Sequence, residues 1–150
     1  MIKQIIITSL VLSLLLCAGC AEPERHVAVD ELYQEGVDAW ESGDLATLEE
    51  TVAAFEDRFP GEPPGLYLEA LLTLEREGLD SAVPVFDAFY HQAYERYISG
   101  YDQLEAEQRR CLATTRGAAV RTANLYVEHS RYSEYEKFSF LVEDLDTLLR

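Results

Sequence analysis

The sequence is short of basic residues. It contains 12 Lys and Arg against 28 Asp and Glu, which gives a formal net charge of −16. Such a chain is repelled by the phosphates of nucleic acids and by anionic membrane surfaces. Nucleic acid is therefore excluded as a partner. The acidic surface is expected either to be solvated or to meet a basic partner or divalent cations.

Recognisable catalytic motifs are also missing. The sequence has no HExxH, no CxxC, no glycine-rich phosphate loop and no GxSxG. Its three histidines, at positions 26, 91 and 129, have no carboxylate or cysteine at a spacing typical of metal ligands. The sequence therefore predicts a protein that is not an enzyme and that has no metal site and no cofactor.

Long apolar runs are scarce. The run from residue 5 to residue 16 follows Lys3 and is well short of the ~20 residues that a membrane-spanning helix needs. Small residues, Ala18 and Gly19, come shortly after it. A positive start, a short apolar core and small residues before a cut site are typical of a secretory signal peptide.

Cysteine is rare, with three in the chain, and two of them close the apolar run in "SLLLCAGC". The last four residues resemble the lipobox of bacterial lipoproteins, with Cys17 at the place where leucine is usual. The resemblance implies that residues 1–19 are removed and that Cys20 is acylated. Because Ala21 is not aspartate, it also implies an outer-membrane location facing the periplasm. The alternative is a plain signal peptide with a chance cysteine.

Beside the lipidated Cys20, only Cys111 remains after maturation, so no internal disulfide can form. Arg109 and Arg110 flank this thiol and would lower its pKa if it were exposed; the alternative is a small core residue on a helix. We expect residues 20–28 to form a lipidated tether and residues 29–150 a single domain, which is long enough for a core.

Strand signals are nearly absent after the signal peptide, and apolar residues recur at steps of three and four, the spacing of one helix face. The first stripe is Leu45, Leu48, Val52, Phe55 and Phe59, and the second is Leu79, Ala82, Phe86, Phe89 and Ala93. A third stripe is Tyr135, Phe138, Val142, Leu145 and Leu149. Gly43 and Gly78 precede the first two stripes, at places where a helix–helix turn favours glycine. The segment "PGEPPG", residues 60–65, is the clearest helix breaker.

The first two stripes are related by the shift that takes Leu45 to Leu79, and the helices before them share this shift. Helix pairs that repeat with a period of ~34 residues resemble the tetratricopeptide repeat, with Gly36 at the small position of the first helix and Pro60 at the end of the copy. The resemblance covers residues 29–95 and implies an all-α fold: a short stack of antiparallel helix pairs with C-terminal capping helices. A generic helical bundle is the alternative. The sequence leaves open whether residues 102–129 form one helix or two broken near Gly117.

The resemblance also implies a binding surface. In tetratricopeptide repeats the fifth residue usually faces a concave groove, and here that position holds Tyr33, Tyr67 and Tyr101; we assign Trp40 to the same surface. Tyrosine offers apolar area and a hydroxyl group, which suits peptide binding. The alternative is that these rings pack against the neighbouring repeat.

The sequence thus predicts a membrane-anchored periplasmic lipoprotein that acts as a protein–protein interaction adaptor, with a cell-envelope protein or peptide as its partner. The main alternative is a cell-envelope lipoprotein that binds a small ligand or peptide in its groove.

Overall fold

The computed structural model describes residues 24–150. The predicted signal peptide 1–19 and the predicted lipidation site Cys20 lie outside the described residues. Within residues 24–150 all regular secondary structure is helical, which confirms the all-α prediction. In this part of the chain, no helix combines the length and the apolar character that a membrane crossing requires.

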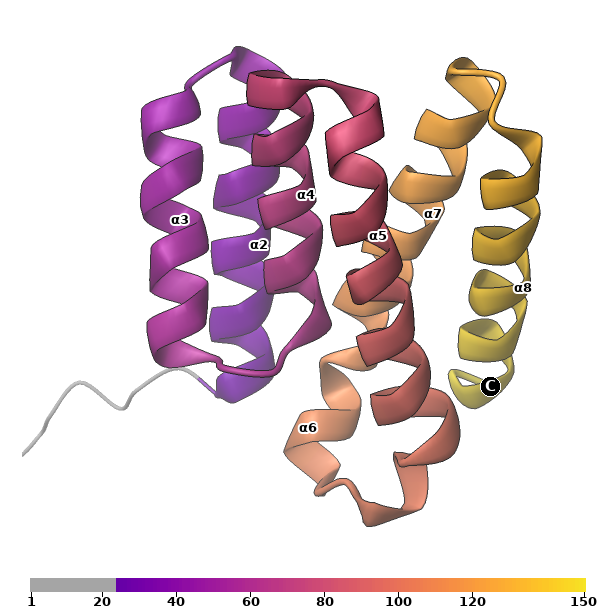
Figure 1. Ribbon diagram of the computed structural model, residues 1–150. Coiled ribbons are helices and arrows are strands. Elements are labelled where there is room, and N and C mark those ends of the chain that lie inside the picture. Colours follow the sequence, from indigo (N-terminus) through magenta and orange to yellow (C-terminus); the bar gives the residue numbers. More distant parts are fainter. Residues whose placement is uncertain (1–23) are drawn as a thin grey trace, which may run out of the picture.

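Six longer helices pack in pairs. They are α2 (Arg25–Ser42), α3 (Leu45–Arg58), α4 (Pro63–Glu77), α5 (Leu79–Ala93), α7 (Leu112–Glu128) and α8 (Tyr132–Leu148). The pairs are α2 with α3, α4 with α5 and α7 with α8. In Figure 1, α2, α4 and α7 run in one direction and their partners run back. The pair α4 with α5 is central along the chain, and α7 of the last pair contacts both α4 and α2.

The turn between α2 and α3 shows why the sequence makes a helical hairpin. Gly43 ends α2 with φ 77°, a left-handed conformation that favours glycine. The next residue, Asp44, caps α3, because its carboxylate accepts hydrogen bonds from the backbone N–H of Thr47 at 3.1 Å and from the Thr47 hydroxyl at 2.7 Å. The glycine at this turn was expected from the sequence.

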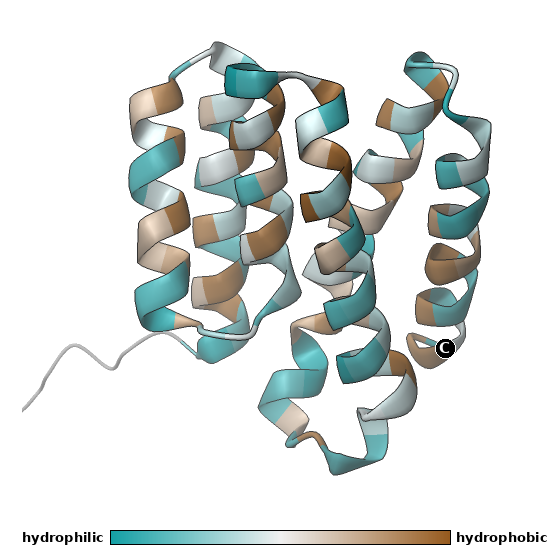
Figure 2. Ribbon diagram, viewed as in Figure 1, coloured by the Kyte–Doolittle hydropathy of each residue, from teal (hydrophilic) through white to brown (hydrophobic). Residues whose placement is uncertain are grey.

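The two apolar stripes of the first half lie in the core, as predicted. Leu48, Phe55, Phe86 and Phe89 are at most 1 % exposed, while the acidic residues between them face solvent. Figure 2 shows the resulting alternation of apolar and polar segments along each helix. Helices α2 and α4 approach closely at Gly36, where an added Cβ would lie 2.6 Å from a methyl group of Leu68. This contact explains the small residue at that position.

The third stripe is correct only in part. Phe138 and Leu145 are fully buried, but Tyr135 and Leu149 are 39 % and 47 % exposed. Leu141 takes the buried position next to Phe138. Helix α8 packs mainly against α7, so its buried face is centred a fraction of a turn away from the predicted stripe.

The segment between α5 and α7 is irregular. It contains a π-helical stretch η1 (Tyr94–Ser99), a 3₁₀ turn η2 (Tyr101–Gln103) and a short helix α6 (Ala106–Arg110). The break before α7 falls at Cys111, whereas Gly117 lies inside α7. Residues 102–129 therefore contain two helices, and the break is not at the glycine.

Candidate functional site

A hollow of about 200 Å³ lies between α2, α4 and α7. Its lining residues come from these three helices: Trp40, Tyr67, Arg121, Asn124, Leu125 and Glu128. The structure therefore brings together two of the four predicted binding residues, Trp40 and Tyr67, at one site. We call this site the Trp40 hollow.

Trp40 supplies the accessible aromatic surface of the hollow. Its ring is partly buried against the core, and its indole Nε1 donates a hydrogen bond of 2.9 Å to Glu75 on α4. Across the hollow, Arg121 of α7 donates a hydrogen bond of 2.8 Å to Glu41 of α2. The rim thus holds both acidic and basic groups around an aromatic ring, which suits contact with a polar partner that inserts one apolar side chain.

The prediction that Tyr33 and Tyr67 face an accessible groove is wrong. They are only 5 % and 1 % exposed, and their ring centroids are 5.8 Å apart. Burial raises the pKa of the Tyr33 phenol to about 12 and raises that of Tyr67 as well. The two rings pack between neighbouring helix pairs, which was the alternative for these residues, and Tyr67 contributes part of the floor of the Trp40 hollow.

Tyr101 lies elsewhere. It belongs to η2, in the irregular segment after α5, and the Arg109 guanidinium sits over its ring at 4.7 Å from the centroid. The three tyrosines therefore do not line one surface, and the prediction that they do is wrong. The repeat spacing fails here because this irregular segment separates the second helix pair from the third.

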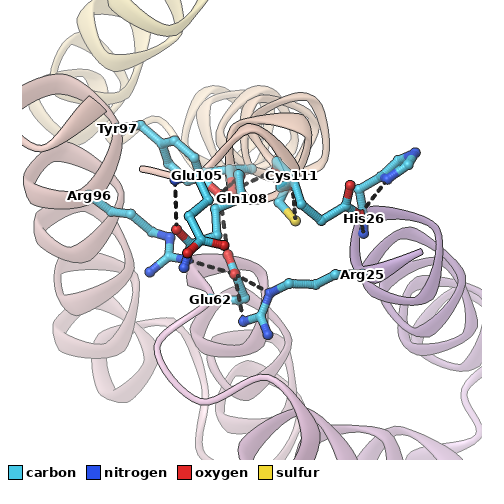
Figure 3. Close-up of polar contacts among 10 residues, drawn as sticks. Arg25, His26, Glu62, Arg96, Tyr97, Glu105, Gln108 and Cys111 are labelled. Atoms are coloured by element: carbon cyan, nitrogen blue, oxygen red, sulfur yellow. Dashed lines mark hydrogen bonds and ion pairs between the residues drawn. The ribbon is translucent and has the colours of Figure 1, made fainter. Parts of the chain in front are cut away.

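A buried carboxylate, which the sequence did not reveal, organises the other end of the bundle. The side chain of Glu62, between α3 and α4, is 0 % exposed. Its Oε1 accepts hydrogen bonds from Arg25 at 2.9 Å and from Arg96 at 2.7 Å, and its Oε2 accepts one from the Tyr97 hydroxyl at 3.2 Å. Figure 3 shows Glu62 between the two guanidinium groups, beside Cys111 and Gln108. A buried charge needs such partners, because removing it from water is costly.

Cys111 lies beside this network and is fully buried. Burial and then the nearby Glu62 carboxylate raise the pKa of its thiol to about 12. The effect expected of Arg109 and Arg110 is therefore absent, since it required an exposed thiol. Cys111 is a core residue, the alternative that the sequence allowed.

His26, Glu107 and Glu24 form an adjoining polar group. His26 Nδ1 lies 2.7 Å from Glu107 Oε1, and the His26 backbone N–H donates to the same oxygen at 2.7 Å. These hydrogen bonds lower the pKa of Glu107. The three residues offer ligand atoms within 4.8 Å of one another, but Arg110 donates to both carboxylates, at 2.9 and 3.3 Å. The Arg110 guanidinium thus already pairs with both carboxylates, which argues for an ion-pair cluster.

Two further hollows flank the connection between α3 and α4. One, of about 290 Å³, is lined mostly by apolar residues, among them Phe55, Phe59 and Leu66. The other, of about 500 Å³, is polar and lies against η1 and α6. Gly61 and Gln92 line both hollows. The chain matches no protein-family model, no curated protein and no solved structure.

Proposed function

We propose that this protein is a lipid-anchored, periplasm-facing lipoprotein of the outer membrane that acts as a protein–protein interaction adaptor. The anchor is Cys20, for which the support is the lipobox-like "CAGC". Several acyl chains hold a protein at a bilayer where a single chain is marginal.

We further infer that the helix pairs form a stack like that of tetratricopeptide repeats. The support is threefold: the pairs follow one another along the chain, their first helices run in one direction, and α3 and α5 begin at Leu45 and Leu79, one repeat period apart. Stacks of this kind bury a continuous core and leave the surface of their first helices for binding.

The Trp40 hollow is the observation that carries the adaptor proposal. Its volume of about 200 Å³ is below the ~300–1,000 Å³ of typical small-molecule sites. It has room for one side chain of a partner, which is how aromatic anchors and their pockets work at protein interfaces. The tryptophan and arginine in its lining are residue types enriched at such interfaces.

The adaptor proposal is tested by Trp40→Ala. We expect this variant to lose most of the partner captured by mild crosslinking in cells of the host, with little change in melting temperature, since Trp40 is only partly buried. Tyr132→Ala is the matched control, because Tyr132 is an aromatic residue on α8 that is 66 % exposed and does not line the hollow. Equal capture by wild type and Trp40→Ala would contradict the proposal.

The anchor is tested separately by Cys20→Ser. This change should abolish acylation and leave uncut precursor in the cytoplasmic membrane. Wild-type protein that is freely soluble in the periplasm and cut at another residue would contradict the anchor.

A cell-envelope lipoprotein that binds a small ligand or peptide is the second candidate. The two adjoining hollows near Gly61 and Gln92 favour it, because the polar one reaches about 500 Å³. Native mass spectrometry of the gently purified protein distinguishes the candidates: a small molecule that remains bound favours the ligand binder.

A further inference from the structure

The two ends of the helical bundle are formed by different segments of the chain. One end holds the first turn of α2, the connection from α3 to α4, the segment from α5 to α7 and the C-terminus (Figure 1). We call it the anchor-side end; it comprises residues 24–28, 56–64, 92–111 and 146–150. The far end holds the three hairpin turns and comprises residues 38–50, 73–83 and 121–134.

Chain length ties the anchor-side end to the proposed lipid anchor, and the inference rests on that anchor. Arg25, the first residue of α2, follows Cys20 by five positions, which span at most ~18 Å when fully extended. Helix α2, with 18 residues, is itself ~27 Å long. An acylated Cys20 therefore keeps the first turn of α2 close to the lipid surface, while the end of α2 that carries Trp40 can lie farther away.

Charge then distinguishes an upright domain from one that lies on its side. Between residues 27 and 57, which form most of α2 and α3, there are ten carboxylates and no Lys or Arg. An anionic headgroup layer repels this flank. The repulsion is weaker at the anchor-side end, where six of the eleven Lys and Arg residues of the described chain lie; they are Arg25, Arg58, Arg96, Arg109, Arg110 and Arg150. Two of these, Arg25 and Arg96, already pair with the buried Glu62.

The far end is poorer in basic residues. It has three of them and ten carboxylates, against six and nine in the slightly longer anchor-side end. The anchor-side end also carries Tyr101, half-buried beneath Arg109. Tyrosine and arginine side chains combine an apolar body with a polar tip and are suited to the membrane–water interface.

We propose that the anchor-side end rests against the phospholipid headgroups, with the exposed Arg58 and with Arg109, which lies over Tyr101, nearest the phosphates. The domain then stands upright on the membrane. The far end, which carries Trp40 and the Trp40 hollow, faces away from the bilayer, where a partner can reach it. The orientation gives the adaptor a defined binding direction.

Energy transfer from tryptophan tests this orientation, because Trp40 is the only tryptophan in the chain. Two matched variants in a Trp40→Phe background move the donor: Ala106→Trp at the start of α6, on the anchor-side end, and Ala46→Trp at the start of α3, on the far end. Both alanines are exposed and lie in the first turn of a helix. The full-length chain is expressed in its host, purified in detergent and reconstituted into vesicles of zwitterionic and anionic phospholipid with an acceptor dye on the headgroup.

We expect transfer from the Ala106→Trp donor to be several-fold greater than from the Ala46→Trp donor, with wild-type Trp40 close to the latter. Circular dichroism checks that all three proteins are equally helical, and Gln103→Trp, at another exposed position of the anchor-side end, replaces Ala106→Trp if that variant does not fold. Equal transfer, or greater transfer from the far end, in protein that carries acyl chains would overturn the orientation alone. Mass spectrometry of the N-terminal peptide from the same preparation shows whether Cys20 is acylated. If Cys20 carries no acyl groups, the proposed anchor is refuted, and with it the orientation that rests on the anchor.

Discussion

Glu62 offers the sharpest test of what holds the anchor-side end together. The change is Glu62→Gln, which keeps the size of the side chain and removes its charge. In the folded protein this carboxylate is 0 % exposed and bonds Arg25 and Arg96, whose side chains are 33 % and 19 % exposed. The variant leaves both guanidinium groups without the carboxylate that they share and weakens the hydrogen bond from Tyr97.

The expected magnitude follows from these exposures. Removing one partner of a fully buried ion pair costs ~3–5 kcal/mol, because an uncompensated charge remains. Since both arginines keep some access to water, we expect a loss at the lower end, about 3 kcal/mol. For a domain of this size such a loss lowers the melting temperature by roughly 10 °C.

Glu49→Gln is the matched control. Glu49 also pairs with an arginine, Arg76, but these side chains are 59 % and 46 % exposed. Exposed ion pairs contribute at most ~1 kcal/mol, so this variant should unfold close to wild type. The assay is urea and thermal unfolding of the Cys20→Ser chain without residues 1–19, followed by circular dichroism. Small, equal effects of the two substitutions would refute the reasoning, because the buried network would then contribute no more than a surface pair.

Three further predictions concern the core. Phe86→Ala should lower the free energy of unfolding by about 3–5 kcal/mol, because Phe86 is fully buried. Phe140 is 56 % exposed, so Phe140→Ala should cost much less. Equal melting temperatures of the two variants would mean that the buried face is misassigned. The folded-state pKa of Cys111, about 12, lies above its ordinary value of 9.0, so the unfolded chain releases the thiol proton first. Stability that the protonated thiol contributes below pH 9 is therefore lost as the pH rises towards 12, by up to ~1.4 kcal/mol per pH unit. Urea unfolding at rising pH should show a shallower decline for Cys111→Ala. In the Cys20→Ser chain without residues 1–19, Cys111 is the only cysteine, and rapid reaction of this folded chain with a thiol reagent at pH 8 would contradict the burial. Finally, Tyr126→Phe should be nearly neutral, because the buried Tyr126 hydroxyl has no hydrogen-bond partner within residues 24–150. Tyr97→Phe should destabilise the protein by roughly 1–3 kcal/mol, because it removes the hydrogen bond to Glu62. Unfolding free energies of the two variants, compared with wild type, test this difference.

Periodicity was sufficient to predict the helical class and the first four helices. The stripes through Phe55 and Phe86 are buried, and the turn glycines at 43 and 78 have positive φ. These features are local: a helix face repeats every three or four residues, and a left-handed turn residue favours glycine. A single sequence records such constraints directly.

The third helix pair could not be placed from the period of the first two, because an irregular segment lies before it. Helices α3 and α5 begin at Leu45 and Leu79, one repeat period apart, whereas α8 begins only at Tyr132, well beyond one period after Leu79. The irregular segment from Tyr94 to Cys111 accounts for the excess. Tyr101, which the predicted period placed in a third repeat, therefore lies in the irregular segment. Its spacing from Tyr67 in the sequence does not correspond to an equivalent position in the structure.

Glu62 could not be found from the sequence for a different reason. Its partners are Arg25, Arg96 and Tyr97, which are 34 to 37 positions away, and no local pattern records contacts at that separation. A glutamate between Gly61 and Pro63 in a helix breaker is typical of a solvated loop. Only the packed bundle shows that this loop side chain points inward.

The irregular segment between α5 and α7 and the buried carboxylate belong to one arrangement. Arg96 and Tyr97, in the π-helical start of this segment, bond Glu62, and Glu107 near its end bonds His26. Because Glu62 also bonds Arg25, both ends of the segment hold the first turn of α2. If Cys20 carries the anchor, any pull from the membrane enters the domain at this turn. On the anchor proposal, hydrogen bonds that join segments 37 to 81 positions apart would distribute such a force over three parts of the chain and strengthen the first turn of α2.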